Sequence, residues 1–328
     1  MHINLLKYKR LYQLVIISLM FTVHLKCDAQ VDMLTNQYVF QDFQLNPAKI
    51  IKDKNSLNFY YRHQWMQFNN SPKLYSLSSN FRILDNFYTG VIVNKTEFGG
   101  SYSSYMTQLS AAYRINLGEE NHSITIGEGI KLTQLTSNYS KLILSDQSDP
   151  QFPLSPTRGY FTDFTAGVFY RNKFFKSGVA VNSILGITDE SKSLPYNSSI
   201  NADIGILIKH KDRDYSEIDQ STQINFRGRL NQFNNLQLEA IFDCYATSSF
   251  SFGAGYRHDI NQAYTKFYGG NSLLAHITIR ISNLSPEKKI VFAFGTESNA
   301  FNQRLDVANN GTYEGVIAFE KYNKRKKR

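Results

Sequence analysis

The chain has 328 residues and a formal net charge of +9, with 14% aromatic and 19% charged residues, 7 Pro and 2 Cys. So many aromatic residues exclude a disordered chain, and two cysteines exclude a disulfide-stapled mini-protein. The excess positive charge lies at the two ends, because residues 30–320 are neutral overall. The basic composition therefore predicts no nucleic-acid partner, since the body of the chain carries no basic excess to form a groove.

The N-terminus has the composition of an export signal. Lys7, Lys9 and Arg10 precede an apolar stretch over 11–25, which is short for a membrane-spanning helix. Cleavage after Ala29 would then release the mature chain. The alternative is a lipoprotein signal with a lipidated Cys27, but that site normally needs a small residue before the Cys, and Lys26 occupies this position. We expect residues 1–29 to be a signal peptide.

The rest of the chain alternates apolar and polar residues with a period of two, which is typical of β-strands and not of helices. About fourteen segments show this pattern, most of them ten or more residues long. They are 56–66, 73–82, 87–95, 102–117, 122–135, 160–171, 173–182, 199–209, 215–230, 235–246, 249–258, 267–282, 288–297 and 312–321. Soluble strands usually have five or six residues, whereas a tilted strand needs about 9–11 to cross a bilayer.

The connections between these segments also differ in length. Alternate connections are short, and the others include long stretches. The short ones are 84–86, 118–121, 172, 210–214, 247–248 and 283–287; the long ones are 136–159, 183–198, 259–266 and 298–311. Outer-membrane barrels have short periplasmic turns and longer outside loops. We therefore predict an all-β protein: a transmembrane antiparallel outer-membrane β-barrel of about 14 strands.

The alternative fold is a secreted soluble β-sandwich, which would have shorter strands. One residue argues against the barrel. Glu128 lies on the same face as Ile126 and Ile130, and a carboxylate in mid-membrane is costly. An irregular strand register near Glu128 would avoid this cost. The predicted organisation is the signal peptide 1–29, an N-terminal segment 30–55 that could plug the lumen, the barrel 56–322 and a basic tail 323–328.

The sequence offers little catalytic chemistry. It contains no metal-ligand spacing, nucleophile elbow or phosphate-binding glycine loop, so we expect no cofactor, no metal and no enzymatic activity. His276, with Thr278 and Arg280 on one strand face, could be imagined as a catalytic cluster. Polar residues on an inward face are, however, what any barrel lumen carries. Asp146, Asp149 and Asp163 are more simply explained as solvated charges than as a Ca²⁺ site.

Several motifs resemble the PorP/SprF family of type IX secretion system membrane proteins from Bacteroidetes. The resemblance is clearest over residues 30–185. The residues that carry it are Asn46, Pro47, Ala48, Arg62, Gln64, Trp65, Pro72, Asn94, Arg114, Asp149, Pro150 and Phe152. Further similar stretches are Gly167–Tyr170 and Gly178–Asn182. One departure is that Lys49-Ile50-Ile51 follows Asn-Pro-Ala, where the family usually has a glycine.

The resemblance implies a non-enzymatic outer-membrane component that assists secretion or surface anchoring of large adhesins, in some members for gliding motility. It implies as partners the C-terminal targeting domain of a secreted adhesin, secretion-ring subunits and outer-membrane lipid. We expect cargo to contact the loops 136–159 and 183–198, because surface loops carry recognition. Candidate contact residues at the loop bases are the aromatics Tyr139, Phe152, Tyr160 and Phe161; an interfacial aromatic girdle is the simpler explanation for them.

Two further expectations concern the lumen and the rival functions. Arg62, Gln64 and Arg114 are expected to line the lumen and hold the Asn46–Ala48 segment there. The alternatives to secretion are a passive porin, which needs an open lumen, and an outer-membrane enzyme, which needs a nucleophile beside His276.

Overall fold

The computed structural model describes twelve stretches of the chain. They are residues 38–50, 54–66, 69–118, 122–141, 155–185, 198–208, 222–231, 236–247, 249–260, 271–285, 288–299 and 311–322. The predicted signal peptide 1–29 and the basic tail 323–328 lie outside these described residues.

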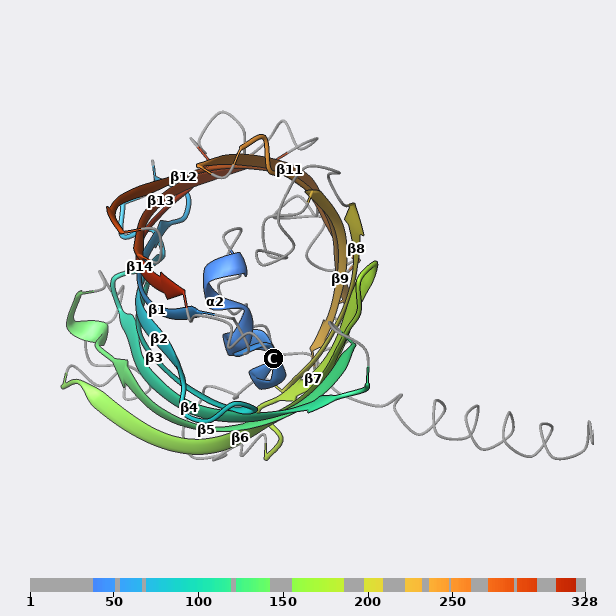
Figure 1. The fold of residues 1–328 in the computed structure, drawn as a ribbon. Coiled ribbons are helices and arrows are strands. Elements are labelled where there is room, and N and C mark those ends of the chain that lie inside the picture. The colour runs from blue at the N-terminus through green and yellow to red at the C-terminus, as the bar shows by residue number, and fades with distance from the viewer. Residues whose placement is uncertain are drawn as a thin grey trace, which may run out of the picture.

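Fourteen strands form one closed antiparallel barrel, in which every strand pairs with its neighbours in sequence and β14 pairs with β1 (Figure 1). The strands are β1 (Lys54–His63), β2 (Lys73–Arg82), β3 (Phe87–Phe98), β4 (Tyr102–Asn116), β5 (Ser123–Ser137), β6 (Thr157–Arg171), β7 (Phe175–Asn182), β8 (Ser199–Ile208), β9 (Thr222–Asn231), β10 (Leu236–Cys244), β11 (Phe250–Asp259), β12 (Asn271–Ser285), β13 (Lys288–Asn299) and β14 (Thr312–Tyr322). Closure leaves no unpaired sheet edge, which a membrane could not tolerate. The predicted fold class and strand number are confirmed.

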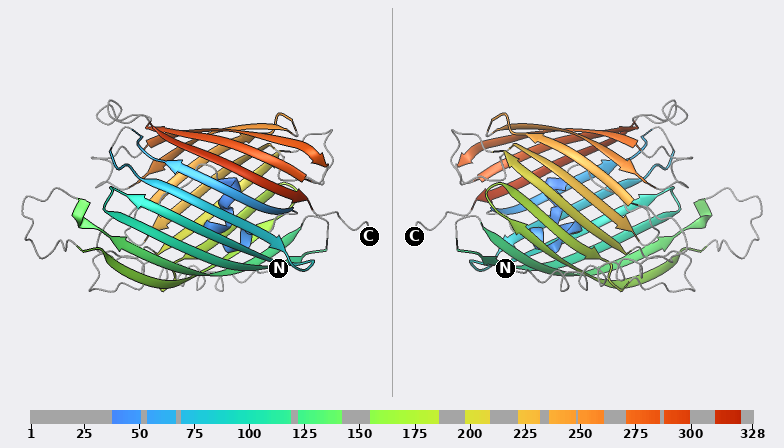
Figure 2. Two further views of the ribbon diagram at one scale, coloured as in Figure 1. Left: turned by 90° about the vertical axis from the view of Figure 1, so that its left-hand side faces the viewer. Right: turned by 90° about the vertical axis from the view of Figure 1, so that its right-hand side faces the viewer.

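The two faces of the wall have opposite chemistry. Along β1, Leu57, Phe59 and Tyr61 point outward and are exposed, whereas Asn58 and Arg62 are buried inside. The same alternation of exposed apolar and buried polar residues continues around the barrel. A soluble sandwich would bury its apolar face, so this inverted pattern excludes that alternative. Figure 2 shows the strong tilt of the strands that carry this pattern.

The strand register around Glu128 is regular, although an irregularity there would have kept the carboxylate from facing the membrane. Glu128 lies directly opposite Ala111 on β4 and Ala166 on β6, and both ladders run through this point without a shift. Its side chain is exposed on the outer face. The expectation that the strand slips near Glu128 is therefore wrong: Ile126, Ile130 and Leu132 keep their outward positions only if Glu128 also faces outward.

Most strand bounds fall within three residues of the predicted ones, and the larger differences are at the starts of β9 and β12. Strand β9 is described from Thr222, and the predicted turn 210–214 lies outside the described residues. The predicted alternation of loop lengths does not extend to the β3–β4 connection. Residues 99–101 alone join these strands, because Gly99 and Gly100 adopt φ of 57° and 73° and close a tight turn. Strand β12 is described from Asn271, and its predicted first residues 267–270 lie outside the described residues.

The chain between the predicted signal and the first strand folds inside the barrel. Helix α2 (Tyr38–Leu45) and the 3₁₀ helix η1 (Pro47–Ile50) lie in the lumen in both Figure 1 and Figure 2. Helix α2 is kinked at Gln41, whose φ and ψ are −132° and 22°. A second 3₁₀ helix, η2 (Tyr139–Lys141), follows β5. Within the described ranges, no helix has the length and apolarity to span a membrane.

Candidate functional site: the barrel lumen and its N-terminal segment

The segment Tyr38–Ile50, which we call the lumenal segment, is anchored by the Asn-Pro-Ala motif. Asn46 caps η1: its Oδ1 accepts a hydrogen bond from the backbone N–H of Ala48 at 3.0 Å. Pro47 follows as the first helical residue, where its fixed φ suits a helix and its missing N–H costs nothing. The same amide reaches the wall, because Nδ2 donates to the carbonyls of Val168 on β6 and Val179 on β7, at 3.2 and 3.5 Å.

Two glycines of the wall make this close approach possible. A Cβ on Gly127 would overlap the backbone of Pro47 and Ala48, and a Cβ on Gly167 would overlap the side chain of Asn46. Both glycines face inward on β5 and β6. Backbone can therefore pack directly on backbone at this point, which a side chain would prevent.

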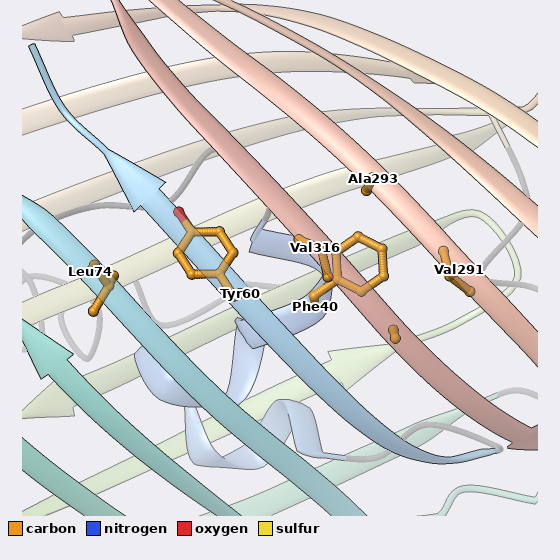
Figure 3. Packing of buried hydrophobic residues seen from close by; sticks show 7 residues of the cluster. Phe40, Tyr60, Leu74, Val291, Ala293 and Val316 are labelled. Carbon is orange, nitrogen blue, oxygen red and sulfur yellow. The ribbon is translucent and has the colours of Figure 1, made fainter. Parts of the chain in front are cut away.

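Apolar side chains fill the space around the two ends of the lumenal segment. Phe43 and Ile50 pack with Tyr88, Ile92 and Ala112 of β3 and β4, all of them at most 2% exposed. Phe40 packs against a second cluster, on the adjoining wall from β13 to β2, shown in Figure 3. Its members on β1, β2, β13 and β14 are Tyr60, Leu74, Val291, Ala293, Val316 and Ala318. These inward apolar residues are exceptions to the polar lumen, and they lie where the segment covers them.

Three side-chain amides of the wall hydrogen-bond to carbonyls of helix α2. The pairs are Asn58 to Phe40 at 3.2 Å, Gln108 to Phe43 at 3.1 Å and Asn182 to Leu45 at 2.8 Å. The last carbonyls of a helix have no partner within it. The wall thus supplies the hydrogen bonds that this short, kinked helix lacks.

Two ion pairs complete the attachment. Lys49 of η1 lies 2.7 Å from Asp203 on β8, and Asp42 of α2 lies 3.7 Å from Arg227 on β9. Lys49 directly follows the Asn-Pro-Ala motif, where the family that the sequence resembles usually has a glycine. Its ammonium also lies 5.7 Å from the ring centre of Phe169. The lumenal segment thereby contacts the barrel on both sides of the lumen.

A connected set of buried ion pairs, the ionic chain, runs along the inner wall from β14 to β9. Its consecutive members are Glu314, Arg62, Glu297, Arg257, Glu239 and Arg227, with Asp42 of the lumenal segment at its end. The links have N–O distances of 2.8 Å for Arg62–Glu297, 2.8 Å for Arg257–Glu297 and 2.6 Å for Arg257–Glu239. Alternating signs let each buried charge inside the chain face opposite charges on both sides, which offsets its desolvation.

The structure places the described motif residues in the lumenal segment, on the inner wall of the barrel and in the β1–β2 connection. Asn46, Pro47 and Ala48 form the anchor, and Arg62 belongs to the ionic chain. Asn94 is buried on the inner face of β3. Arg114 also faces inward, 5.7 Å from the ring centre of Tyr88, which itself packs on the lumenal segment.

Gln64, Trp65 and Pro72 lie in the β1–β2 connection, outside the strands. The backbone N–H of Gln64 donates to the carbonyl of Pro72 at 3.0 Å, and Trp65 has a positive φ of 54°. Gln64 therefore helps to close this connection, and it makes none of the contacts that hold the lumenal segment. Asp149, Pro150 and Phe152 lie outside the described residues.

The three described aromatics proposed for cargo contact are not brought together. Tyr139 is 8% exposed and packs edge-on against Tyr102, whose hydroxyl donates to that of Tyr139 at 3.0 Å. Tyr160 and Phe161 lie inside β6, which begins three residues earlier than predicted, at Thr157. Tyr160 faces outward and is 69% exposed, while Phe161 is on the inner face.

The polar cluster at His276 has a structural explanation. Nε2 of His276 lies 2.8 Å from Oδ1 of Asp243, whose Oδ2 accepts hydrogen bonds from Gln223 and Asn225. Gly253 lies between them on β11 and has no side chain in the way. No hydroxyl is hydrogen-bonded to His276 among the described residues, and these residues contain no group of three metal-ligating side chains either.

Sequence reasoning missed Asp42, Lys49, Asp203 and Arg227 as anchors of the lumenal segment. Each is an ordinary charged residue. Asp203 and Arg227 occupy inward positions in the alternation of their strands, and only this could have marked them as lumenal. Their partners lie far away in sequence, so no local pattern pairs them.

A sequence model described as type IX secretion system membrane protein PorP/SprF matches residues 28–319. No curated protein matches the sequence. Solved structures with a similar fold include a Pseudomonas aeruginosa FadL homologue, with 13% identity, a TM-score of 0.45 and coverage of 84% of this chain and 91% of that one. Others are the P. putida toluene transporter TodX (10%, 0.44, 85% and 93%) and the Acinetobacter baumannii outer membrane protein Omp33 (7%, 0.43, 82% and 99%).

Proposed function

Because the protein belongs to the PorP/SprF family and is thus an outer-membrane component of type IX secretion, we propose that it is non-enzymatic and assists secretion or surface anchoring of large adhesins. The cargo contact would be made by the adhesin's C-terminal targeting domain. Secretion-ring subunits are the proposed periplasmic partners, with the basic tail 323–328 and the short turns as their docking surface. Gliding motility would follow where the anchored adhesin is a motility adhesin.

One observation carries this proposal: the lumenal segment crosses the barrel interior and is attached to several walls. Asn46 binds β6 and β7, Lys49 pairs with β8, and Asp42 pairs with β9. A passive porin needs a water-filled lumen, whereas an anchor needs only a stable wall and presented loops. The attached segment therefore favours an anchor over a channel.

The first test is affinity purification of the tagged protein from detergent-solubilised outer membranes, read by mass spectrometry. We expect a large surface protein with a C-terminal targeting domain, together with secretion-ring subunits. Shortening the β5–β6 connection (142–154) or the β7–β8 connection (186–197) should remove the adhesin and keep the ring subunits. Shortening 261–270 between β11 and β12 is the matched control and should keep both.

The second test separates the anchor from the passive channel. Purified wild-type barrel in planar bilayers should give no stable open conductance. A barrel that recovers neither adhesin nor ring subunits, but conducts ions steadily, would overturn the proposal in favour of the porin.

A further inference from the structure

The outer face of β4–β6 carries a carboxylate in the middle of the membrane-facing surface. Glu128 is exposed there, with Ile126 and Ile130 as its outward neighbours along β5. Its depth follows from the register. It pairs with Ala111 and Ala166, which lie in the interior of two strands of 15 residues each.

Aromatic residues place Glu128 between the two membrane interfaces. On β4, the outward Tyr113 and Tyr105 lie on either side of Ala111; on β6, the outward Tyr170 and Tyr160 lie on either side of Ala166. Aromatic girdles mark the two interfaces of an outer-membrane barrel. Along β5 the outward residues on both sides of Glu128 are also apolar, Ile124 and Ile126 toward one end and Ile130 and Leu132 toward the other, so the carboxylate lies within the apolar band that faces the membrane.

Glu128 has no partner on its own barrel. Among the described residues, none forms a hydrogen bond or an ion pair with its side chain. The residues on either side in the ladder are both alanine, so no long side chain covers the carboxylate. By contrast Lys95, an outward charge nearer the outer rim, is paired with Glu97 at 2.6 Å and lies over the rings of Tyr75 and Tyr105.

A second copy of this chain does not offer the missing cation. The described outward-facing basic residues are Lys95, already paired, Lys73 and Arg158 at one end of their strands, and Lys288 and Lys321 at the other. Two copies in one membrane share the same orientation, so none of these lies at the depth of Glu128. A lipid headgroup also lies at the interface and not at this depth.

We propose that the outer face of β4–β6 around Glu128 docks against a different outer-membrane β-barrel, one that presents a basic side chain at mid-membrane depth. An ionisable residue within the membrane is costly alone and is normally paired. Ala111 and Ala166 leave the backbone surface flat at this point, which lets a second wall approach closely enough to form the pair. The inference requires only that the barrel lies in an outer membrane, and it is independent of the cargo.

The test is photo-crosslinking in intact cells from a benzoylphenylalanine at position 111 or 166. Position 275 on β12, also an outward-facing alanine, is the matched control on another wall. We expect an adduct with one other outer-membrane barrel from 111 and 166 and none from 275. Glu128→Gln and Glu128→Leu should each lower its yield by at least about tenfold, as when one partner of a desolvated charge pair is removed.

A second measurement guards against a mere folding defect. The purified Glu128→Leu barrel should unfold at the same or a higher urea concentration in lipid vesicles, because the change removes a charge from hydrocarbon. Replacing the partner's basic residue by Leu should give the same loss of adduct, with no further loss in combination with Glu128→Leu. The proposal is overturned by an adduct only with a second copy of this chain, by no adduct, by an adduct insensitive to both Glu128 variants, or by a less stable Glu128→Leu barrel.

Discussion

The lumen has two walls of different construction. The wall β3–β7 meets the lumenal segment with glycines, apolar side chains and hydrogen bonds to backbone: Gly127, Gly167, Ile92 and Asn182 are examples. The wall from β9 to β1 also has an apolar cluster under Phe40, but its main feature is the ionic chain of paired charges.

This difference teaches how a barrel can hold a segment of its own chain. Glycines and side-chain amides recognise the shape and backbone of η1, so they fix one position and one register. Paired charges keep the remaining lumen polar without contacting most of the segment. Among the described residues, Arg227 joins the two systems through its ion pair with Asp42.

The largest expected effect comes from the ionic chain. Arg62→Ala should lower the free energy of unfolding by about 3–5 kcal/mol, because it removes the cation that pairs with the buried Glu314 and one of the two cations that pair with Glu297. Urea unfolding in lipid vesicles measures this. The control is Arg82→Ala, which breaks an exposed pair with Asp85 and should cost no more than about 1 kcal/mol. Equal effects of the two variants would mean that the ionic chain stabilises the barrel no more than an exposed ion pair does.

The next effect tests the glycine wall. Gly127→Val should displace the lumenal segment, because the new side chain meets the backbone of Pro47 and Ala48, at a cost of about 1–3 kcal/mol. We expect protease cleavage within 38–50 and open-channel conductance in bilayers, with the barrel still folded. The matched control is Gly315→Val on β14, where an added Cβ meets nothing within 4 Å. A closed, protease-resistant Gly127→Val barrel would contradict the prediction.

A smaller effect is expected at the anchor itself. Asn46→Ala removes the cap of η1 and the hydrogen bonds to Val168 and Val179, so the docked state should lose about 1–2 kcal/mol. Amide hydrogen exchange at Ala48–Ile50 should then be roughly 5–30 times faster. Asn86→Ala, which removes an exposed amide pair with Asn116 in a turn, should leave this exchange unchanged.

The smallest effect is expected at His276. His276→Gln should leave adhesin secretion unchanged, because the amide of Gln can still donate to Asp243. Cell-surface adhesin, measured by immunofluorescence, checks this. Loss of secretion with a normally folded barrel would instead favour the enzyme hypothesis.

The strands were predictable because their signal is local. Inward and outward residues alternate in the sequence itself, so β1, β4 and β13 could be placed to within a few residues. Glu128 was the exception. The cost of a membrane-facing carboxylate favoured an irregular strand register, but a one-residue slip would turn every outward Ile of β5 inward, which costs more.

The lumen was predictable only in part. Arg62 and Arg114 could be assigned to the inner face by parity, and the Asn-Pro-Ala motif indicated a special segment before the first strand. The sequence does not show that Gln64 belongs to a turn or that Tyr139 is buried, because both depend on how a connection folds back on the barrel.

By itself, then, the sequence determined the barrel, the faces of its strands and its membership of an outer-membrane secretion family, because alternation, strand length and motif order are all readable along the chain. Only the tertiary structure decided what fills the lumen and which charges meet. Asn46 reaches Val168, and Arg62 reaches Glu314, across more than a hundred residues of chain, and such pairs form only once the barrel has closed.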